Sequence, residues 1–350
     1  MANKSEGTVM SLGITYRESP RTGYAIYGPL SVNKQPMVAI VDTGSTSTLL
    51  VWKEWYELFT GLGACRTFMF VCFSCSDPRG PPRVFKVRNT QLFAFEYSAN
   101  VFGADDISFG LIGGQDPPPP MFPSANYLGL KPDIDGTGFS LMDQLRSKRV
   151  LKTATFTLFL RPTKESDIFR GKLILGGVDP TQYVIPLRYV PLLSIDDYVV
   201  ELRSLSIQAG RTTLGINQRA TIRTGDNYIR IPSIYSTGLV QALAGAASNI
   251  RGQKVDIVFD GKRNSYIVDC PLRKYLPSLT FYLGPDGDVP LEISSQGYVR
   301  KFVGAQPCTV MIMPLEGYTW QLPAGALVGN YIEFQPVDNR LGVAKLKPGP

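Results

Sequence analysis

The sequence predicts an all-β chain of two lobes with a few short helices, and three observations support this fold class. Short β-branched runs alternate with frequent turn residues, since the 350 residues include 34 glycines and 27 prolines. One hydrophobic motif occurs twice, about half a chain apart, which indicates two homologous lobes. A chain of this length with 44% hydrophobic residues can bury two substantial cores. We therefore expect one lobe at residues 1–165 and a second at residues 166–350.

The first copy of the motif is the apolar run Val38–Val41, which leads directly into Asp42. Thr43, Gly44 and Ser45 follow the carboxylate. A buried strand fixes the backbone, the glycine lets the turn close tightly, and the hydroxyls can donate to the carboxylate. This is how a catalytic aspartate is usually presented. An ordinary strand-to-turn corner is the alternative, because Asp and Gly are common turn residues.

The second copy of the motif has lost its carboxylate. Another apolar run ends at Arg223, which stands 181 residues after Asp42 and in the same place of the motif. Thr224 and Gly225 repeat the turn, and Asp226 follows it. The two copies predict two related loops, only one of which carries the expected acid.

With these two loops and several further motifs in order, the sequence resembles the pepsin-like (A1 family) aspartic peptidases. In that family each lobe contributes a hydrophobic-Asp-Thr-Gly loop, and the two aspartates meet on the floor of a peptide-binding cleft. The resemblance covers nearly the whole chain and implies the bilobal pepsin-like fold. The other matching segments are Ala94–Ser98, Asn126–Leu130, Leu173–Tyr183, Tyr189–Leu192 and Val337–Ala344.

The resemblance also assigns roles around the cleft, with several departures. Tyr97 resembles the tyrosine of the flap, although a half-buried strand tyrosine is the alternative. Leu49 stands where the family usually has a tryptophan that hydrogen-bonds this tyrosine. Asn126 replaces a glycine in the segment that braces the first loop, and Gln321–Ala324 stands where the second bracing segment is expected.

The substitution at position 223 predicts loss of the peptidase reaction. Aspartic peptidases use two carboxylates that share one proton and hold a water between them. A guanidinium opposite Asp42 supplies no neutral acid, and we expect Arg223 to form an ion pair with Asp42 and to fill the place of the water. Asp226 lies three residues further on, so we expect it to leave the loop in another direction and to balance Arg223 locally.

Composition excludes other classes of chemistry. The chain has no histidine, which removes Ser-His-Asp and Cys-His catalysis and every His-ligated metal site. We expect no metal and no cofactor. The formal net charge is +7, but the cations are scattered without a basic stripe and interleaved aromatics, so no nucleic-acid partner is expected.

Targeting signals are the next consideration. No apolar run approaches the length of a membrane span, and we expect no transmembrane segment. Residues 1–6 lack the apolar region of a signal peptide, whereas the family normally enters the secretory route behind a signal and a prosegment. Either the sequence is trimmed, or this relative is located elsewhere.

Five cysteines leave one outside any set of pairs. By the resemblance, Cys270 and Cys308 match a second-lobe disulfide, which we expect if the compartment is oxidising. Cys65, Cys72 and Cys75 fall where the family often has a small disulfide loop. Three thiolates make a poor zinc site, so we expect one bridge and one thiol there; three reduced cysteines are the alternative.

Several local elements are also predicted. Two strands should meet at a turn at Asn33–Lys34, and helices should begin at Ser140 and span Pro232–Ile250. The segment Gly113–Pro120 should form an exposed polyproline spacer or docking ligand, outside any sheet. The aromatic segment Trp52–Tyr56 is either core or the lining of a pocket.

Three functional hypotheses follow. The first is an inactive peptidase homologue whose cleft binds an extended peptide or a protein. The second is a structural subunit of a larger assembly. The third is an active aspartic endopeptidase with an unusual site.

Overall fold

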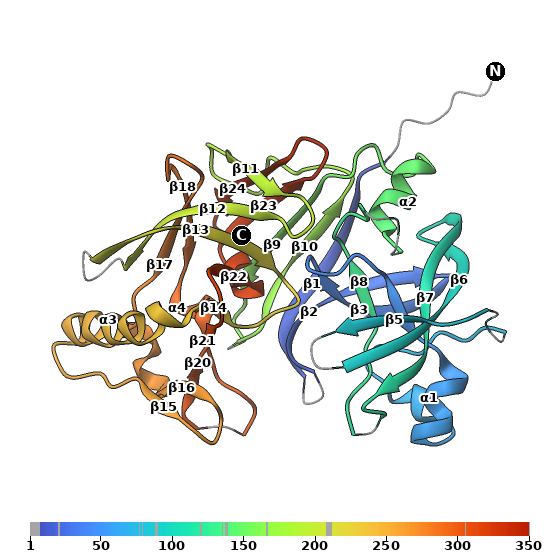
Figure 1. The fold of residues 1–350 in the computed structure, drawn as a ribbon, viewed down its shortest axis with the longest axis horizontal. Helices are drawn as coiled ribbons and strands as arrows, with labels where there is room; N and C mark the ends of the chain where they lie inside the picture. The colour runs from blue at the N-terminus through green and yellow to red at the C-terminus, as the bar shows by residue number, and fades with distance from the viewer. Residues whose placement is uncertain are drawn as a thin grey trace.

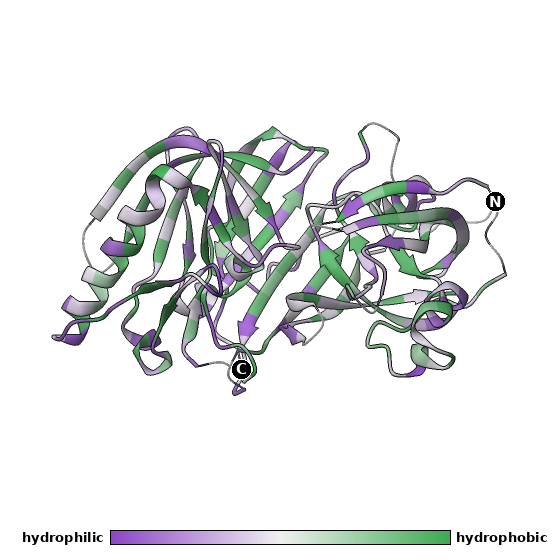
Figure 2. Cartoon of the chain, turned by 60° about the horizontal axis from the view of Figure 1, so that its bottom comes forward, coloured by the Kyte–Doolittle hydropathy of each residue, from purple (hydrophilic) through white to green (hydrophobic). Residues whose placement is uncertain are grey.

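The computed structural model describes residues 8–19, 22–76, 78, 80–87, 90–119, 121–134, 136, 139–165, 167–207, 212–304 and 306–349. Two halves rich in β-strand lie on either side of a set of long central strands (Figure 1). The strands of both halves are largely apolar, and hydrophilic residues lie more often at the loops (Figure 2). The predicted fold class, a bilobal β fold with short helices, is confirmed.

The elements of the first half and of the central strands follow in chain order. They are β1 (Met10–Ser19), β2 (Gly23–Val32), β3 (Gln35–Asp42), β4 (Leu49–Val51), α1 (Lys53–Thr60), η1 (Ala64–Arg66), β5 (Arg83–Val87), β6 (Thr90–Val101), β7 (Ala104–Asp116), β8 (Tyr127–Gly129), α2 (Leu141–Ser147), β9 (Phe156–Pro162) and β10 (Phe169–Leu175).

The second half continues from there to the last strand. It contains β11 (Arg188–Ser194), β12 (Val199–Ile207), β13 (Thr212–Arg223), β14 (Ile229–Pro232), α3 (Ser233–Arg251), β15 (Val258–Asp260), β16 (Ser265–Val268), η2 (Cys270–Tyr275), β17 (Leu279–Leu283), β18 (Val289–Ile293), α4 (Ser295–Tyr298), β19 (Val299–Arg300), β20 (Cys308–Val310), β21 (Ile312–Leu315), β22 (Thr319–Pro323), η3 (Ala324–Leu327), β23 (Asn330–Gln335) and β24 (Arg340–Lys345).

A shared central sheet joins the two halves. β1 pairs with β2 on one side and with β10 on the other, and β10 continues through β9 and β23 to β24 and β11. Phe156 of β9 stacks on Phe334 of β23 with ring centroids 4.5 Å apart. Segments from the start, middle and end of the chain thus form one sheet. The predicted domain boundary at 165/166 falls between the paired strands β9 and β10 and stays a prediction.

Each site loop follows a strand that pairs with a parallel neighbour. In the first half, β3 runs parallel to β8, with Asp42 opposite Gly129. In the second half, β13 runs parallel to β22, with Arg223 opposite Pro323. Each loop therefore begins where a buried strand ends beside a parallel neighbour, as the repeated motif predicted.

Several local predictions are confirmed. Asn33 and Lys34 both have positive φ and connect β2 to β3. Ser140 caps α2 by accepting a hydrogen bond from the Asp143 amide at 3.3 Å. α3 occupies the predicted helix and ends at Gly252, which has a left-handed conformation.

The predicted Cys270–Cys308 disulfide forms, and so does the one bridge expected among Cys65, Cys72 and Cys75. Cys65 is bonded to Cys72 and Cys270 to Cys308, while Cys75 lies outside both bridges. None of the helices in the described ranges has the length and apolar composition needed to cross a bilayer.

The prediction for Gly113–Pro120 is wrong in part. β7 continues to Asp116, because Gly113 and Gly114 leave room for the rings of the neighbouring strand β6. Of the prolines, Pro119 is buried rather than exposed, and Pro120 lies outside the described residues. The aromatic segment Trp52–Tyr56 is part of the core, because Trp55 and Tyr56 are only 6% and 4% exposed and pack in an apolar cluster.

Candidate functional site

The two site loops are joined by a reciprocal set of hydrogen bonds. The Thr43 amide donates to Thr224 Oγ1 and the Thr224 amide donates to Thr43 Oγ1, both at 3.0 Å. Thr43 Oγ1 also donates to the carbonyl of Ile222 at 2.8 Å, and Thr224 Oγ1 donates to that of Val41 at 2.9 Å. Both threonines are buried. The loops are therefore held back to back by equivalent residues, which fixes their relative position.

Asp42 lies at the centre of this junction. Its Oδ1 accepts a hydrogen bond from the Gly44 amide at 2.8 Å. Gly225 of the opposite loop covers the carboxyl group so closely that a Cβ at this position would collide with it. The backbone of the second loop thus approaches the carboxylate directly, which only glycine allows.

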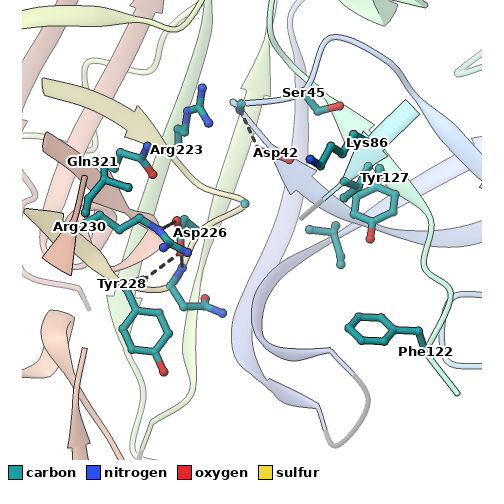
Figure 3. Close-up of a pocket in the computed structure, with 16 residues that line it drawn as sticks. Asp42, Ser45, Lys86, Phe122, Tyr127, Arg223, Asp226, Tyr228, Arg230 and Gln321 are labelled. Carbon is teal, nitrogen blue, oxygen red and sulfur yellow. Dashed lines mark hydrogen bonds and ion pairs between the residues drawn. The ribbon is translucent and has the colours of Figure 1, made fainter. Parts of the chain in front are cut away.

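The aliphatic part of the Arg223 side chain lies near Asp42, whereas its guanidinium pairs with another residue. The point that a Cβ on Gly44 would occupy lies 3.2 Å from Asp42 Oδ1 and 3.4 Å from Arg223 Cγ. The guanidinium extends beyond this point, and its Nη2 lies 2.8 Å from Asp197 Oδ1. The predicted ion pair between Arg223 and Asp42 is therefore wrong, because the guanidinium pairs with Asp197, in the turn between β11 and β12. Figure 3 shows the Arg223 side chain directed away from Asp42.

Asp197 and its neighbour connect the two halves above this point. Asp197 Oδ1 is also 3.5 Å from the ammonium of Lys131, which follows the first bracing strand. The Tyr198 hydroxyl donates to the Leu130 carbonyl at 2.7 Å. Burial raises the pKa of the Tyr198 phenol well above its usual value, so the hydroxyl remains a donor.

Asp226 is engaged within its own loop. Its Oδ1 accepts from the amides of Asn227 at 2.7 Å and Tyr228 at 3.3 Å, and Oδ2 pairs with Nε of Arg230. The prediction that it balances Arg223 is wrong, since Arg230 on the adjacent strand β14 is its partner. Burial raises the pKa of the Tyr228 phenol, and the charge of Asp226 raises it further while Arg230 opposes the shift.

A cavity of about 590 Å³ opens over the two loops (Figure 3). Its lining comes from both halves of the molecule and from the hairpin of β5 and β6. The lining residues are Ile40, Asp42, Gly44, Ser45, Lys86, Val87, Phe122, Tyr127, Arg223, Gly225, Asp226, Asn227, Tyr228, Arg230, Leu315 and Gln321.

The hairpin side of the cavity differs from the prediction. Tyr97 is absent from the lining and packs instead against Phe73 and Phe109, with centroids 5.7 and 5.8 Å away. It is the half-buried strand tyrosine of the alternative interpretation. Lys86 and Val87, near the end of β5, line the cavity in its place.

The two segments that brace the loops, β8 and β22, differ in the residue opposite the site position, as the sequence indicated. A Cβ on Gly129 would lie 2.6 Å from the Ser45 carbonyl oxygen, so the first brace requires glycine, whereas Pro323 takes this place in the second. Asn126 is fully buried and ties β3 to β4: its amide group donates to the Val38 carbonyl, and its Oδ1 accepts from the Val51 amide. Its substitution for glycine therefore has a structural reason.

Sequence reasoning missed three charged residues of the site, namely Lys86, Asp197 and Arg230. Lys86 lies on a strand that leads into a hairpin, which was the available signal. No sequence signal pointed to Asp197, because it contacts Arg223 from a segment that lies 26 residues away in the chain. Within the described ranges, His, Cys, Asp and Glu side chains form no group of three that could hold a metal ion.

Comparison with known proteins gives consistent results. The family model described as eukaryotic aspartyl protease matches residues 128–346. Renin from Echis ocellatus is 30% identical over 222 residues, covering 62% of this chain and 52% of that protein. Renin from Rattus norvegicus is 27% identical over 218 residues, covering 60% and 50%. Gastricsin from Cavia porcellus is 26% identical over 354 residues, covering 91% and 80%. The chain thus spans about half the length of the renins that it matches.

Proposed function

The chain belongs to the eukaryotic aspartyl protease family, and from this premise we propose that it is an inactive homologue whose cleft binds an extended peptide or a protein segment. The observation that carries the proposal is the place of Arg223. It occupies the position equivalent to Asp42 in the pair of loops, and the same threonine bonds hold both positions.

The reaction of aspartic peptidases needs two carboxylates that share a proton and a water. Among the described residues that line the cavity, Asp226 is the other carboxylate beside Asp42. It already accepts two backbone amides and pairs with Arg230. Because these donors already engage its oxygens, the Asp226 carboxylate is not placed to share a proton and a water with Asp42.

Retention of the binding geometry supports the second part of the proposal. The threonine bonds, the parallel braces and a cavity of about 590 Å³ persist although the second acid is lost. The cavity opens between the halves and beneath a hairpin, so an extended chain can contact several elements at once. Strand edges and loops of this kind recognise peptides through main-chain hydrogen bonds together with side-chain pockets.

A cleavage assay at acid pH tests the inactivity. Fluorogenic peptides are incubated with the wild type and with Asp42→Asn, each with and without pepstatin. We expect no pepstatin-sensitive turnover and equal residual rates for the two proteins, because the second loop places an arginine, and not an acid, at the position equivalent to Asp42. Turnover that pepstatin inhibits and that Asp42→Asn abolishes would overturn the proposal.

A structural role in a larger assembly is the second candidate, and one surface favours it. Leu58 and Phe59 in the last turn of α1 and Leu62 just after it are 80%, 50% and 97% exposed, and Phe59 and Leu62 line one cavity together with Pro119. Exposed apolar side chains gathered in this way often mark protein interfaces. Recovery of a stoichiometric complex from the native source, lost in Leu62→Asp, would favour this role over a free binding protein.

A further inference from the structure

The charges on the wall of the cavity are unequal in number. Its cationic side chains are Lys86, Arg223 and Arg230, and its described acids are Asp42 and Asp226. Arg230 and Asp226 neutralise each other through their direct ion pair. Among the lining residues, this leaves the two cations Lys86 and Arg223 around the carboxylate of Asp42, and Arg223 also pairs with Asp197 outside the lining.

Lys86 is the more accessible of these cations. It is exposed on β5, lines the cavity and forms no ion pair with any residue that the structure describes. Figure 3 shows it reaching into the pocket from the hairpin of the first half, while Arg223 comes from the loop of the second half. The two cations therefore belong to opposite walls.

Arg223 has donors to spare. A guanidinium carries five N–H donors, and the hydrogen bond that Arg223 makes to Asp197 uses one of them, at Nη2. Asp197 is also shared with Lys131, so it does not balance Arg223 alone. The Arg223 side chain is 35% exposed, so a ligand can reach its guanidinium.

We propose that the occupant of the cleft presents a carboxylate, which binds between Lys86 and Arg223. This inference rests on the proposed peptide-binding function and names the class of peptide, an acidic one. A carboxylate matches the planar donors of a guanidinium, and Lys86 adds a point charge from the other wall. When Asp197 is counted together with both of its partners, Arg223 and Lys131, one unit of formal positive charge still remains beside Lys86 and Asp42. A monoanion balances this charge, which favours a carboxylate over a doubly charged phosphate. The carboxylate belongs to an Asp or Glu side chain or to the end of a peptide chain.

Competitive capture of peptides tests this inference. The immobilised full chain is incubated with equimolar degenerate octapeptide libraries whose fifth residue is fixed as Glu, Gln or Lys, all with amidated ends. A fourth library has Gln at this position and a free terminal carboxylate. Bound peptides are quantified by mass spectrometry at low salt and at 0.5 M salt.

We expect the Glu library, or the library with the free carboxylate, to be enriched about fivefold over amidated Gln, and the Lys library to be depleted. The enrichment should fall at high salt, since screening weakens partly exposed ion pairs. Lys86→Gln should reduce it to near unity without loss of folding, because Lys86 is exposed. Arg223→Gln should reduce it as well.

Lys148→Gln is the matched control, since it removes one positive charge from an exposed site outside the cavity. It should retain the enrichment. Equal capture of all libraries by the wild type would overturn the preference for a carboxylate and leave peptide binding in place. Capture of none would overturn both proposals, and equal loss in Lys86→Gln and Lys148→Gln would reduce the effect to net charge.

Discussion

The two site loops have the same frame and different contents. In each, a buried strand ends beside a parallel neighbour and a threonine holds the opposite loop. The first loop presents Asp42, whose Oδ1 accepts from the Gly44 amide at 2.8 Å. The second presents Arg223, whose charge lies against Asp197 from a different turn. The comparison teaches that the frame of an active site is stabilised by groups other than those that react.

This separation has a physical reason. The threonine bonds and the close approach of glycine are buried and contribute to folding whatever residue occupies positions 42 and 223. The charged ends of those two side chains are partly exposed, so replacing one of them costs little stability. The frame can therefore remain folded whichever side chains occupy positions 42 and 223.

The largest effect is expected from the threonine bonds. Thr43→Val removes one acceptor and one donor and leaves the Thr224 amide and the Ile222 carbonyl buried without them. Thr224→Val does the same to the Thr43 amide and the Val41 carbonyl. We expect each variant to lose about 3 kcal/mol of unfolding free energy, measured by urea denaturation, and the two losses to be similar.

Thr221→Val is the control for this pair. Thr221 is also buried on β13, but its Oγ1 makes no hydrogen bond within the described residues, so its replacement should be neutral or slightly stabilising. The double variant Thr43→Val with Thr224→Val should lose less than the two single losses together, because they remove the same junction. Losses that differ by more than about 1 kcal/mol between the single variants would contradict the equivalence of the two loops.

The features that the two site loops share could be predicted from the sequence. The apolar run and the Thr-Gly turn are consecutive in sequence, so their repetition was sufficient to place both loops, and the family resemblance placed the two braces. The family resemblance also predicted the disulfide between Cys270 and Cys308, whereas among the three first-half cysteines it predicted one bridge without choosing its partners. Strand pairing then confirmed the bilobal fold that these motifs implied.

The partners of the charged groups could not be predicted by the same reasoning. Arg223 and Asp226 are three residues apart, and a local pair was the natural expectation, yet each side chain leaves the loop toward a different element. The prediction that Tyr97 lines the cleft was wrong for a similar reason. A motif places a residue on a strand, but which residue reaches the cavity depends on where the hairpin ends, and here that residue is Lys86.

An intermediate effect is expected from the glycines, and it should be unequal. Gly225→Ala puts a Cβ into the Asp42 carboxyl group, whereas at Gly44 the nearest atom to a Cβ is Asp42 Oδ1 at 3.2 Å. We expect a loss of about 2 kcal/mol for Gly225→Ala and less than about 1 kcal/mol for Gly44→Ala, from the same urea measurement. Equal losses would mean that the acid loop and the arginine loop are packed alike, and would break the comparison.

The smallest effect concerns charge at position 223 and its dependence on pH. Arg223→Asp places a second carboxylate near Asp42, since Arg223 Cγ and Asp42 Oδ1 lie within 3.4 Å of one point above Gly44. Like charges raise the pKa of one acid of such a pair in the folded state above its unfolded value. That group binds its proton more tightly when folded, so its contribution to stability is present at low pH and is lost as the pH rises through the raised pKa.

Arg223→Asn is the matched control, because it also removes the pair with Asp197 but adds no charge. The two variants should be equally stable near pH 4, and Arg223→Asp should be less stable by about 1 kcal/mol at pH 7.5. A difference that does not change with pH would mean that the second loop no longer directs its side chain toward Asp42, and the two loops would then share a backbone without sharing a site.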